Sequence, residues 1–266
     1  MELSVRLSPQ RRLIHQCDKA KAQCNVVSGH DGGTQVLRIS DSIVAKCGPG
    51  VRPSEAATQK HAYRYLSCRA VRVPEVIRYF QDHSDASRPV GYLFMEYITG
   101  KTLADLDFGV DDVPSRLAGV IAELRRLPGD VPGPVGGGVP HGPLWGDDAS
   151  TEEFGSLEDL NRWLNKRLEP AGRTIDLRSY PLVLCHLDLC SRNIMITEGD
   201  MICLLGWGHA GFFPRFFEIA AASCVDDEAA YAQDLLRAIQ GVAKPTEKDQ
   251  ECVDLLLKAR PASSRY

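Results

Sequence analysis

The segment LCHLDLCSRNIMI, residues 184–196, is the most informative in this chain of 266 residues. It places His186 and Asp188 between two short apolar runs, and Asn193 follows five residues after the aspartate. In phosphoryl-transfer enzymes such an aspartate accepts or orients the proton of the attacking hydroxyl, and the asparagine holds a metal ion. The alternative is a polar turn between two buried strands, in which His186 bonds to a backbone carbonyl. A lone His-x-Asp would say little, but the spaced asparagine makes the first interpretation more specific.

Upstream of this segment, the first hundred residues predict strands and one helix. Residues 36–47 alternate as two short strands around a polar turn at 40–42, and 76–80 and 91–98 are rich in β-branched and aromatic residues. Ser54 fits as the N-cap of a helix that continues to about Leu66.

After Gly100 the pattern becomes helical. Residues 115–127 and 156–168 carry apolar side chains at helical spacing, and two closing helices are expected near 227–240 and 246–259. Short strands are expected at 182–185, 194–196 and 201–205, whereas 128–146 is too rich in Gly and Pro for a regular element. We therefore expect an α+β fold with two lobes, a small β-rich lobe over 1–98 and a larger helical lobe over 99–266, with a cleft between them.

Composition excludes several classes of protein. Lys and Arg number 31 against 35 Asp and Glu, a net charge of −4, which argues against binding to nucleic acid or a membrane surface. No run of about 18 apolar residues predicts a membrane-spanning helix, and the N-terminus lacks the apolar core of a signal peptide. The nine cysteines form no Cys-x-x-Cys pair, so no zinc ribbon is expected. These features predict a cytoplasmic protein with free thiols.

The chain resembles the aminoglycoside phosphotransferase and choline kinase group, in a form common among fungal proteins, from about Ile43 to Glu218. The motifs that carry this resemblance are VAK at 44–46, a helix opened by Glu55, YLFMEYITGKTL at 92–103, the 184–196 segment, and WGHAGF at 207–212. The resemblance implies a bilobal protein-kinase-like fold. It also implies ATP and magnesium as cofactors and a small molecule as substrate.

The resemblance also implies roles for particular residues. Lys46 would hold the nucleotide phosphates and pair with Glu55, while Met95, Glu96 and Tyr97 would lie at the nucleotide. Asp188, with His186 beside it, would be the catalytic base, and Asn193 a metal ligand. Each residue also has a structural interpretation: Lys46 as a surface lysine, Glu55 as a favourable charge at a helix N-terminus, and Met95 and Tyr97 as core side chains.

The sequence departs from the family at the second metal ligand, where Gly206 stands in place of an aspartate and Gly208 in place of a further carboxylate. Nothing in the sequence indicates that Asp200 or His209 lies where it could replace this metal ligand. The loss is expected to cost on the order of a thousandfold in rate, and Gly206→Asp is expected to raise magnesium-dependent nucleotide affinity. Residues 28–34 are rich in glycine and either cover phosphates through backbone N–H groups or form a plain turn.

Three functional hypotheses follow. The first is an ATP-dependent O-phosphotransferase with a degraded magnesium site. The second is an enzyme of small-molecule metabolism, such as an isomerase or cyclase, that uses Asp188 or His186 without a nucleotide. The third is a pseudokinase that binds without turnover. The acceptor pocket is expected beside the 132–145 loop, lined by Trp145, Phe154, Trp163 and Trp207, which suits an apolar or hydroxylated ligand.

Overall fold

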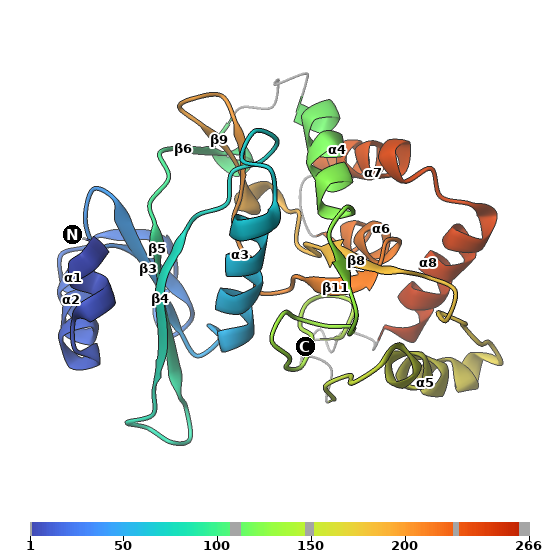
Figure 1. Cartoon of the computed structure of the whole chain (residues 1–266), viewed down its shortest axis with the longest axis horizontal. Helices are drawn as coiled ribbons and strands as arrows, with labels where there is room; N and C mark the ends of the chain where they lie inside the picture. Colours follow the sequence, from blue (N-terminus) through green and yellow to red (C-terminus); the bar gives the residue numbers. More distant parts are fainter. Residues whose placement is uncertain (1, 107–112, 147–151, 226–228, 261–266) are drawn as a thin grey trace.

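The computed structural model describes residues 2–106, 113–146, 152–225 and 229–260 (Figure 1). The N-terminal lobe is built on a five-stranded antiparallel sheet in the order β1-β2-β3-β5-β4. Its strands are β1 (Val26–Gly29), β2 (Gln35–Arg38), β3 (Ile43–Gly48), β4 (Val76–Asp82) and β5 (Val90–Glu96). The mixture of this sheet with separate helices is the α+β class that the sequence predicts.

Helices cover both faces of this sheet (Figure 1). On one face α1 (Glu2–Leu7) and α2 (Gln10–Ala22) pack against it, and on the other lies α3 (Pro53–Tyr65). The expectation of a single helix in the first hundred residues was therefore wrong, because α1 and α2 precede the sheet. Leu13, Cys17 and Ala20 of α2 are buried at helical spacing, which is the signal that could have revealed this helix.

The start of α3 also differs from the prediction. Ser54 is not the N-cap: the helix begins at Pro53, and extended Arg52 precedes it as the cap residue. Proline suits the first helical position because its φ is already near the helical value and its missing N–H would be unpaired there anyway. Strand β5 ends at Glu96, two residues earlier than expected, and the Tyr97 N–H then donates to the Ser42 carbonyl at 2.9 Å.

The C-terminal lobe holds two small sheets, β10-β9-β6 and β11-β8-β7, with helices around them. The strands are β6 (Gly100–Thr102), β7 (Pro128–Gly129), β8 (Leu182–Cys185), β9 (Ile194–Thr197), β10 (Ile202–Leu204) and β11 (Gly211–Pro214). The helices are α4 (Val113–Leu124), α5 (Leu157–Leu168), α6 (Phe217–Ala222), α7 (Ala229–Ala243) and α8 (Glu247–Ala259), with 3-10 turns at Leu103–Asp105, Glu169–Ala171 and Ser191–Asn193.

The predicted helices of this lobe are present, with shifted ends. Ser156 caps α5 by accepting the Asp159 N–H, and Thr246 opens α8 with a capping box. The first residues of the helix expected at 227–240 lie outside the described ranges, and α7 continues to Ala243. Residues 128–146 are mostly irregular, as expected, apart from β7.

Main-chain hydrogen bonds join the two lobes. The Arg72 N–H donates to the Ile202 carbonyl at 2.8 Å, and the Leu204 N–H donates to the Arg72 carbonyl at 3.0 Å. In addition, Thr58 of α3 accepts the Val135 N–H at 3.0 Å. The boundary expected at residue 98 lies between β5 and β6, which belong to different sheets, and remains a prediction. Within the described ranges, no helix combines the length and apolarity needed to cross a bilayer.

Candidate active site

Lys46 and Glu55 form an ion pair between the sheet and α3. Lys46 lies on β3 and Glu55 in the first turn of α3, and the distance from Lys46 Nζ to Glu55 Oε1 is 2.5 Å. The Glu55 side chain is only 3% exposed and the Lys46 side chain 22%. The pairing fixes the lysine ammonium, which stays partly exposed and so can contact an anionic ligand.

Asp188 lies in the loop that follows β8, and Asn193 holds it. The Asn193 Nδ2 donates to Asp188 Oδ2 at 2.8 Å and to the Asp188 carbonyl at 3.0 Å. The Asp188 side chain remains 29% exposed. The carboxylate is thus fixed in orientation while part of it stays open to a ligand.

The loop that carries Asp188 is anchored by Glu218 of α6. The buried Glu218 carboxylate accepts the N–H groups of His186 and Leu187, at 2.7 and 2.9 Å. Leu187 has a φ of +61°, a conformation that costs free energy in a non-glycine residue and that these two bonds help to maintain. Burial raises the pKa of Glu218, an effect that the two N–H donors oppose. Sequence reasoning used Glu218 only as the end of the resemblance and missed this role.

His186 is fully buried and does not face the cleft. Its Nε2 lies 2.9 Å from the Leu205 carbonyl, and its ring packs edge-on against the buried Trp207. Burial lowers the pKa of His186 to about 4, so the ring is neutral near pH 7. This location matches the alternative in which His186 bonds to a carbonyl. We therefore assign to His186 and Trp207 a role in positioning the loop.

His209 lies beside Asp188, with His209 Nδ1 3.5 Å from Asp188 Oδ2. A Cβ on Gly142 would lie 2.8 Å from the His209 ring, so the 133–142 loop packs directly against it, and Gly142 has a φ of +108°. Burial lowers the pKa of His209, with Lys46 and Arg52 lowering it further and Asp188 and Glu55 opposing them. Sequence reasoning gave His209 no geometric role, because nothing in the chain order reveals that it meets Asp188.

A protein-held magnesium ion does not fit these residues. A side chain at Gly206 would place its Cβ less than 3.0 Å from the Asn193 amide oxygen, so this oxygen faces a position that supplies no carboxylate. Asp200 lies on an exposed turn and bonds to Arg116. Across the residues that the structure describes, no group of three or more His, Cys, Asp or Glu side chains could hold a metal ion. We therefore propose no step that depends on magnesium held by side chains.

The three residues expected at the nucleotide are near the end of β5. Met95 packs in the small core between the sheet and α3, and the Tyr97 ring lies under the Arg38 guanidinium at 3.2 Å. Glu96 turns away to bind Arg72 and to accept the Glu75 N–H at 3.3 Å.

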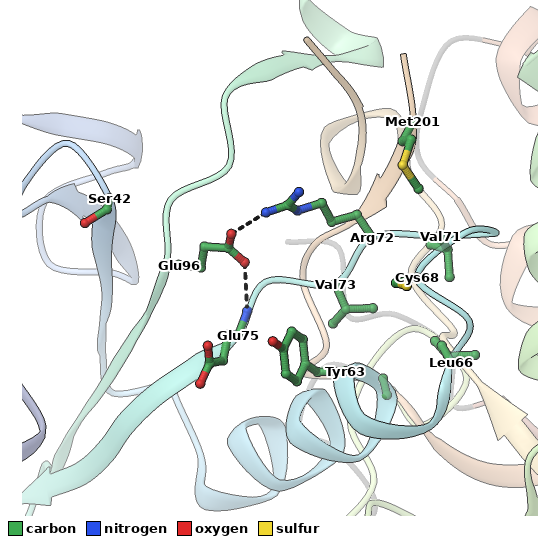
Figure 2. Close-up of a pocket in the computed structure, with 11 residues that line it drawn as sticks. Ser42, Tyr63, Leu66, Cys68, Val71, Arg72, Val73, Glu75, Glu96 and Met201 are labelled. Atoms are coloured by element: carbon green, nitrogen blue, oxygen red, sulfur yellow. Dashed lines mark hydrogen bonds and ion pairs between the residues drawn. The ribbon is translucent and has the colours of Figure 1, made fainter. Parts of the chain in front are cut away.

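Figure 2 shows Glu96 in a separate pocket of about 740 Å³ behind this strand end. None of Lys46, Glu55 and Asp188 lines that pocket. The Glu96 carboxylate therefore lines a pocket that contains neither the ion pair nor Asp188.

The aromatic residues expected to line the acceptor pocket lie in the core. Trp145, Phe154 and Trp163 are each at most 3% exposed, and their ring centroids lie 5.4 to 5.9 Å apart. Trp145 also contacts the rings of Phe213 and Phe217. We therefore leave these three side chains out of the proposed acceptor site.

Comparisons with known proteins identify the family of the chain. The model of the phosphotransferase enzyme family, APH, matches residues 25–250. Similar solved structures include a thermostable mutant of aminoglycoside phosphotransferase APH(4)-Ia in its apo form, at 15% identity and a TM-score of 0.58, covering 88% of this chain and 83% of that one. A second mutant of that enzyme, in a ternary complex with ADP and hygromycin B, is 14% identical with a TM-score of 0.59, over 88% and 82% of the two chains.

A third similar structure is the GDP and kanamycin complex of APH(2")-IIia, at 13% identity and a TM-score of 0.51, over 92% and 88% of the two chains. No curated protein matches the sequence. These likenesses confirm the bilobal kinase-like fold of the aminoglycoside phosphotransferases.

Proposed function

The chain belongs to the phosphotransferase enzyme family, and on that basis we propose that it transfers a phosphoryl group from a nucleotide to a hydroxyl of a small molecule. The observation that carries the proposal is the Lys46–Glu55 ion pair, with a distance of 2.5 Å between Lys46 Nζ and Glu55 Oε1. A lysine held in this way supplies a fixed positive charge, and phosphoryl transfer depends mainly on such positioning and charge stabilisation.

In the proposed reaction, the hydroxyl oxygen of the acceptor attacks the terminal phosphorus as the bond to the leaving nucleotide oxygen breaks. Asp188 Oδ2 or Oδ1 accepts the hydroxyl proton, and Asn193 keeps the carboxylate oriented through its bond at 2.8 Å. Lys46 stabilises the negative charge on the phosphate oxygens. The acceptor is a hydroxyl-bearing small molecule, and with the three aromatic side chains in the core there is no longer a reason to require an apolar one.

A second candidate function is favoured by Gly206. A cleft without the carboxylate at this position suits acid–base chemistry on a metabolite, such as an isomerisation or cyclisation, with Asp188 as the base and no nucleotide. The two candidates share Asp188 and differ in whether a nucleotide binds.

Calorimetric titration of the full chain with ATP and with GTP, each with magnesium and with EDTA, tests the proposal. We expect nucleotide binding, and then ³¹P-detected phosphorylation in a screen of hydroxylated acceptors. Asp188→Asn should lower turnover by about a hundredfold or more while nucleotide binding persists. Asp85→Asn, on the exposed hairpin between β4 and β5, is the matched control and should change neither.

Binding without turnover of any acceptor would favour a binding protein. Absence of nucleotide binding under every condition would overturn the proposal. The search would then turn to metabolites for the second candidate function.

A further inference from the structure

His209 lies close to several charged and titratable groups of the candidate site. It is on the segment between β10 and β11, and Asp188 of the catalytic loop faces it at 3.5 Å. The other titratable and charged groups that act on it are Lys46 of β3, Arg52 just before α3, Glu55 of α3, His141 of the loop before Trp145, and the buried His186. His209 is therefore near both Lys46 and Asp188.

The ring has unused hydrogen-bonding capacity. His209 Nδ1 is shielded from solvent and has no hydrogen-bond partner in the part of the chain that the structure describes, while the side chain as a whole is 31% exposed. Gly206 and Gly208 flank Trp207 just before it, and neither contributes a side chain to the cleft. The segment that would supply carboxylates for a metal ion thus supplies an imidazole instead.

An imidazole can supply the charge that a metal ion would otherwise supply. A bound polyphosphate is strongly anionic, and an anion in contact with a histidine favours its protonated form. The imidazolium has two N–H donors, one for Asp188 and one for a phosphate oxygen. Burial and the neighbouring cations hold the pKa of His209 below 6.5, so the ring is mainly neutral near pH 7 and has a proton to gain.

We infer that His209 binds the nucleotide phosphates in place of a metal ion, and that it takes up one proton from solvent as the nucleotide binds. The inference rests on the proposed function, since it specifies how the same cleft holds its nucleotide. It follows that nucleotide binding persists without a divalent cation and strengthens as the pH falls.

The test is calorimetric titration of the full chain with ATP in EDTA, at about pH 6 and about pH 8, in two buffers of different ionisation enthalpy. The difference in measured binding enthalpy between the two buffers gives the number of protons taken up. We expect binding in EDTA, with uptake approaching one proton per nucleotide. Where His209 is neutral before binding and protonated after it, affinity should fall by up to about tenfold for each unit by which the pH rises.

His209→Asn should abolish the proton uptake and weaken binding in EDTA by about tenfold or more, because asparagine cannot become a cation. His209→Gln is a second variant with the same expected result, and thermal unfolding of both shows that each is folded. His83→Asn, on the hairpin between β4 and β5, is the matched control and should bind like the wild type.

The outcomes separate this inference from the proposed function. Binding that requires magnesium and takes up no proton would overturn the role of His209 while leaving nucleotide binding intact. Proton uptake that survives in both His209 variants would assign it to another group and would also overturn the inference. Absence of binding in either metal condition would overturn the proposed function itself, and this inference with it.

Discussion

The amide oxygen of Asn193 occupies the space in which a side chain on residue 206 would begin. A Cβ at Gly206 would lie less than 3.0 Å from three atoms of the Asn193 amide, and Gly206 has a φ of +73°. The same amide, through its nitrogen, holds Asp188. The absence of a side chain at residue 206 and the orientation of Asp188 are therefore linked through one side chain, that of Asn193.

Gly206→Ala is expected to lower the free energy of unfolding by about 1–3 kcal/mol, because the left-handed backbone and the Asn193 contact both oppose a side chain. Gly206→Asp tolerates the backbone better but displaces Asn193 and releases Asp188. We therefore expect no gain in magnesium-dependent ATP affinity, contrary to what the sequence alone suggested. Urea denaturation and calorimetry measure the two effects. Gly119→Ala is the control, since nothing lies within 4 Å of its added methyl, and a gain in ATP affinity for Gly206→Asp would contradict this account.

Lys46→Met is expected to lower the free energy of unfolding by about 3 kcal/mol, because it leaves the Glu55 carboxylate buried without its partner. Adding Glu55→Gln should recover part of that loss, so the double variant is more stable than Lys46→Met alone. Chemical denaturation of Lys46→Met, Glu55→Gln and the double variant gives the coupling free energy between Lys46 and Glu55. The exposed pair of Arg162 and Asp159 serves for comparison, and Arg162→Met should change stability by less than about 1 kcal/mol. Equal losses of stability for Lys46→Met and Arg162→Met would show that the Lys46 pair is no more stabilising than a surface pair.

Acid is expected to destabilise the protein through His186. Its pKa is about 4 in the folded chain against 6.5 as the ordinary value, so between these values the unfolded chain binds more protons than the folded one. Stability contributed by the neutral ring is complete above pH 6.5 and falls by about 3 kcal/mol as the pH is lowered to about 4. His141, with a pKa also lowered to about 4, adds a loss of the same sign.

The measurement is urea denaturation as a function of pH for the wild type, His186→Asn and the exposed control His15→Gln. The variant at 186 should show a shallower pH dependence than the other two, whatever its absolute stability. An unchanged slope would mean that His186 is not the group that titrates on unfolding.

Trp145→Ala is expected to destabilise the fold by about 3–5 kcal/mol, since it removes a large ring from a packed core. The ring contacts Trp163 and Phe213, each at a centroid distance of 5.4 Å. Nucleotide affinity of the folded protein should stay unchanged, and thermal unfolding with calorimetry checks both. Val131→Ala, 49% exposed, is the control. Loss of ligand affinity with little loss of stability would return Trp145 to the binding site.

Local spacing in the sequence singled out Asp188 and Asn193, and the family resemblance implied the pairing of Lys46 with Glu55. The bond between Asp188 and Asn193 joins residues five apart, and the lysine and glutamate of the ion pair are separated by one short connection. Glu218, His209 and Gly142 were out of reach, because their roles depend on contacts between segments far apart in the chain. The prediction that Trp145 and Trp163 line the acceptor pocket failed for a related reason. An aromatic residue beside an irregular loop gives the same sequence pattern whether its ring faces a ligand or the core.

The pairing of Arg72 with Ile202 and Leu204 has a consequence for synthesis of the chain. The backbone groups of Arg72 find their partners only after β10 has left the ribosome, when the whole five-stranded sheet is already available. The backbone of the N-terminal lobe near Arg72 therefore stays unpaired until residues 202–204 have been translated. A ribosome-bound chain truncated before residue 202 should be more open to protease near residue 72 than one long enough for residues 202–204 to have emerged from the exit tunnel, because only the longer chain can form these bonds.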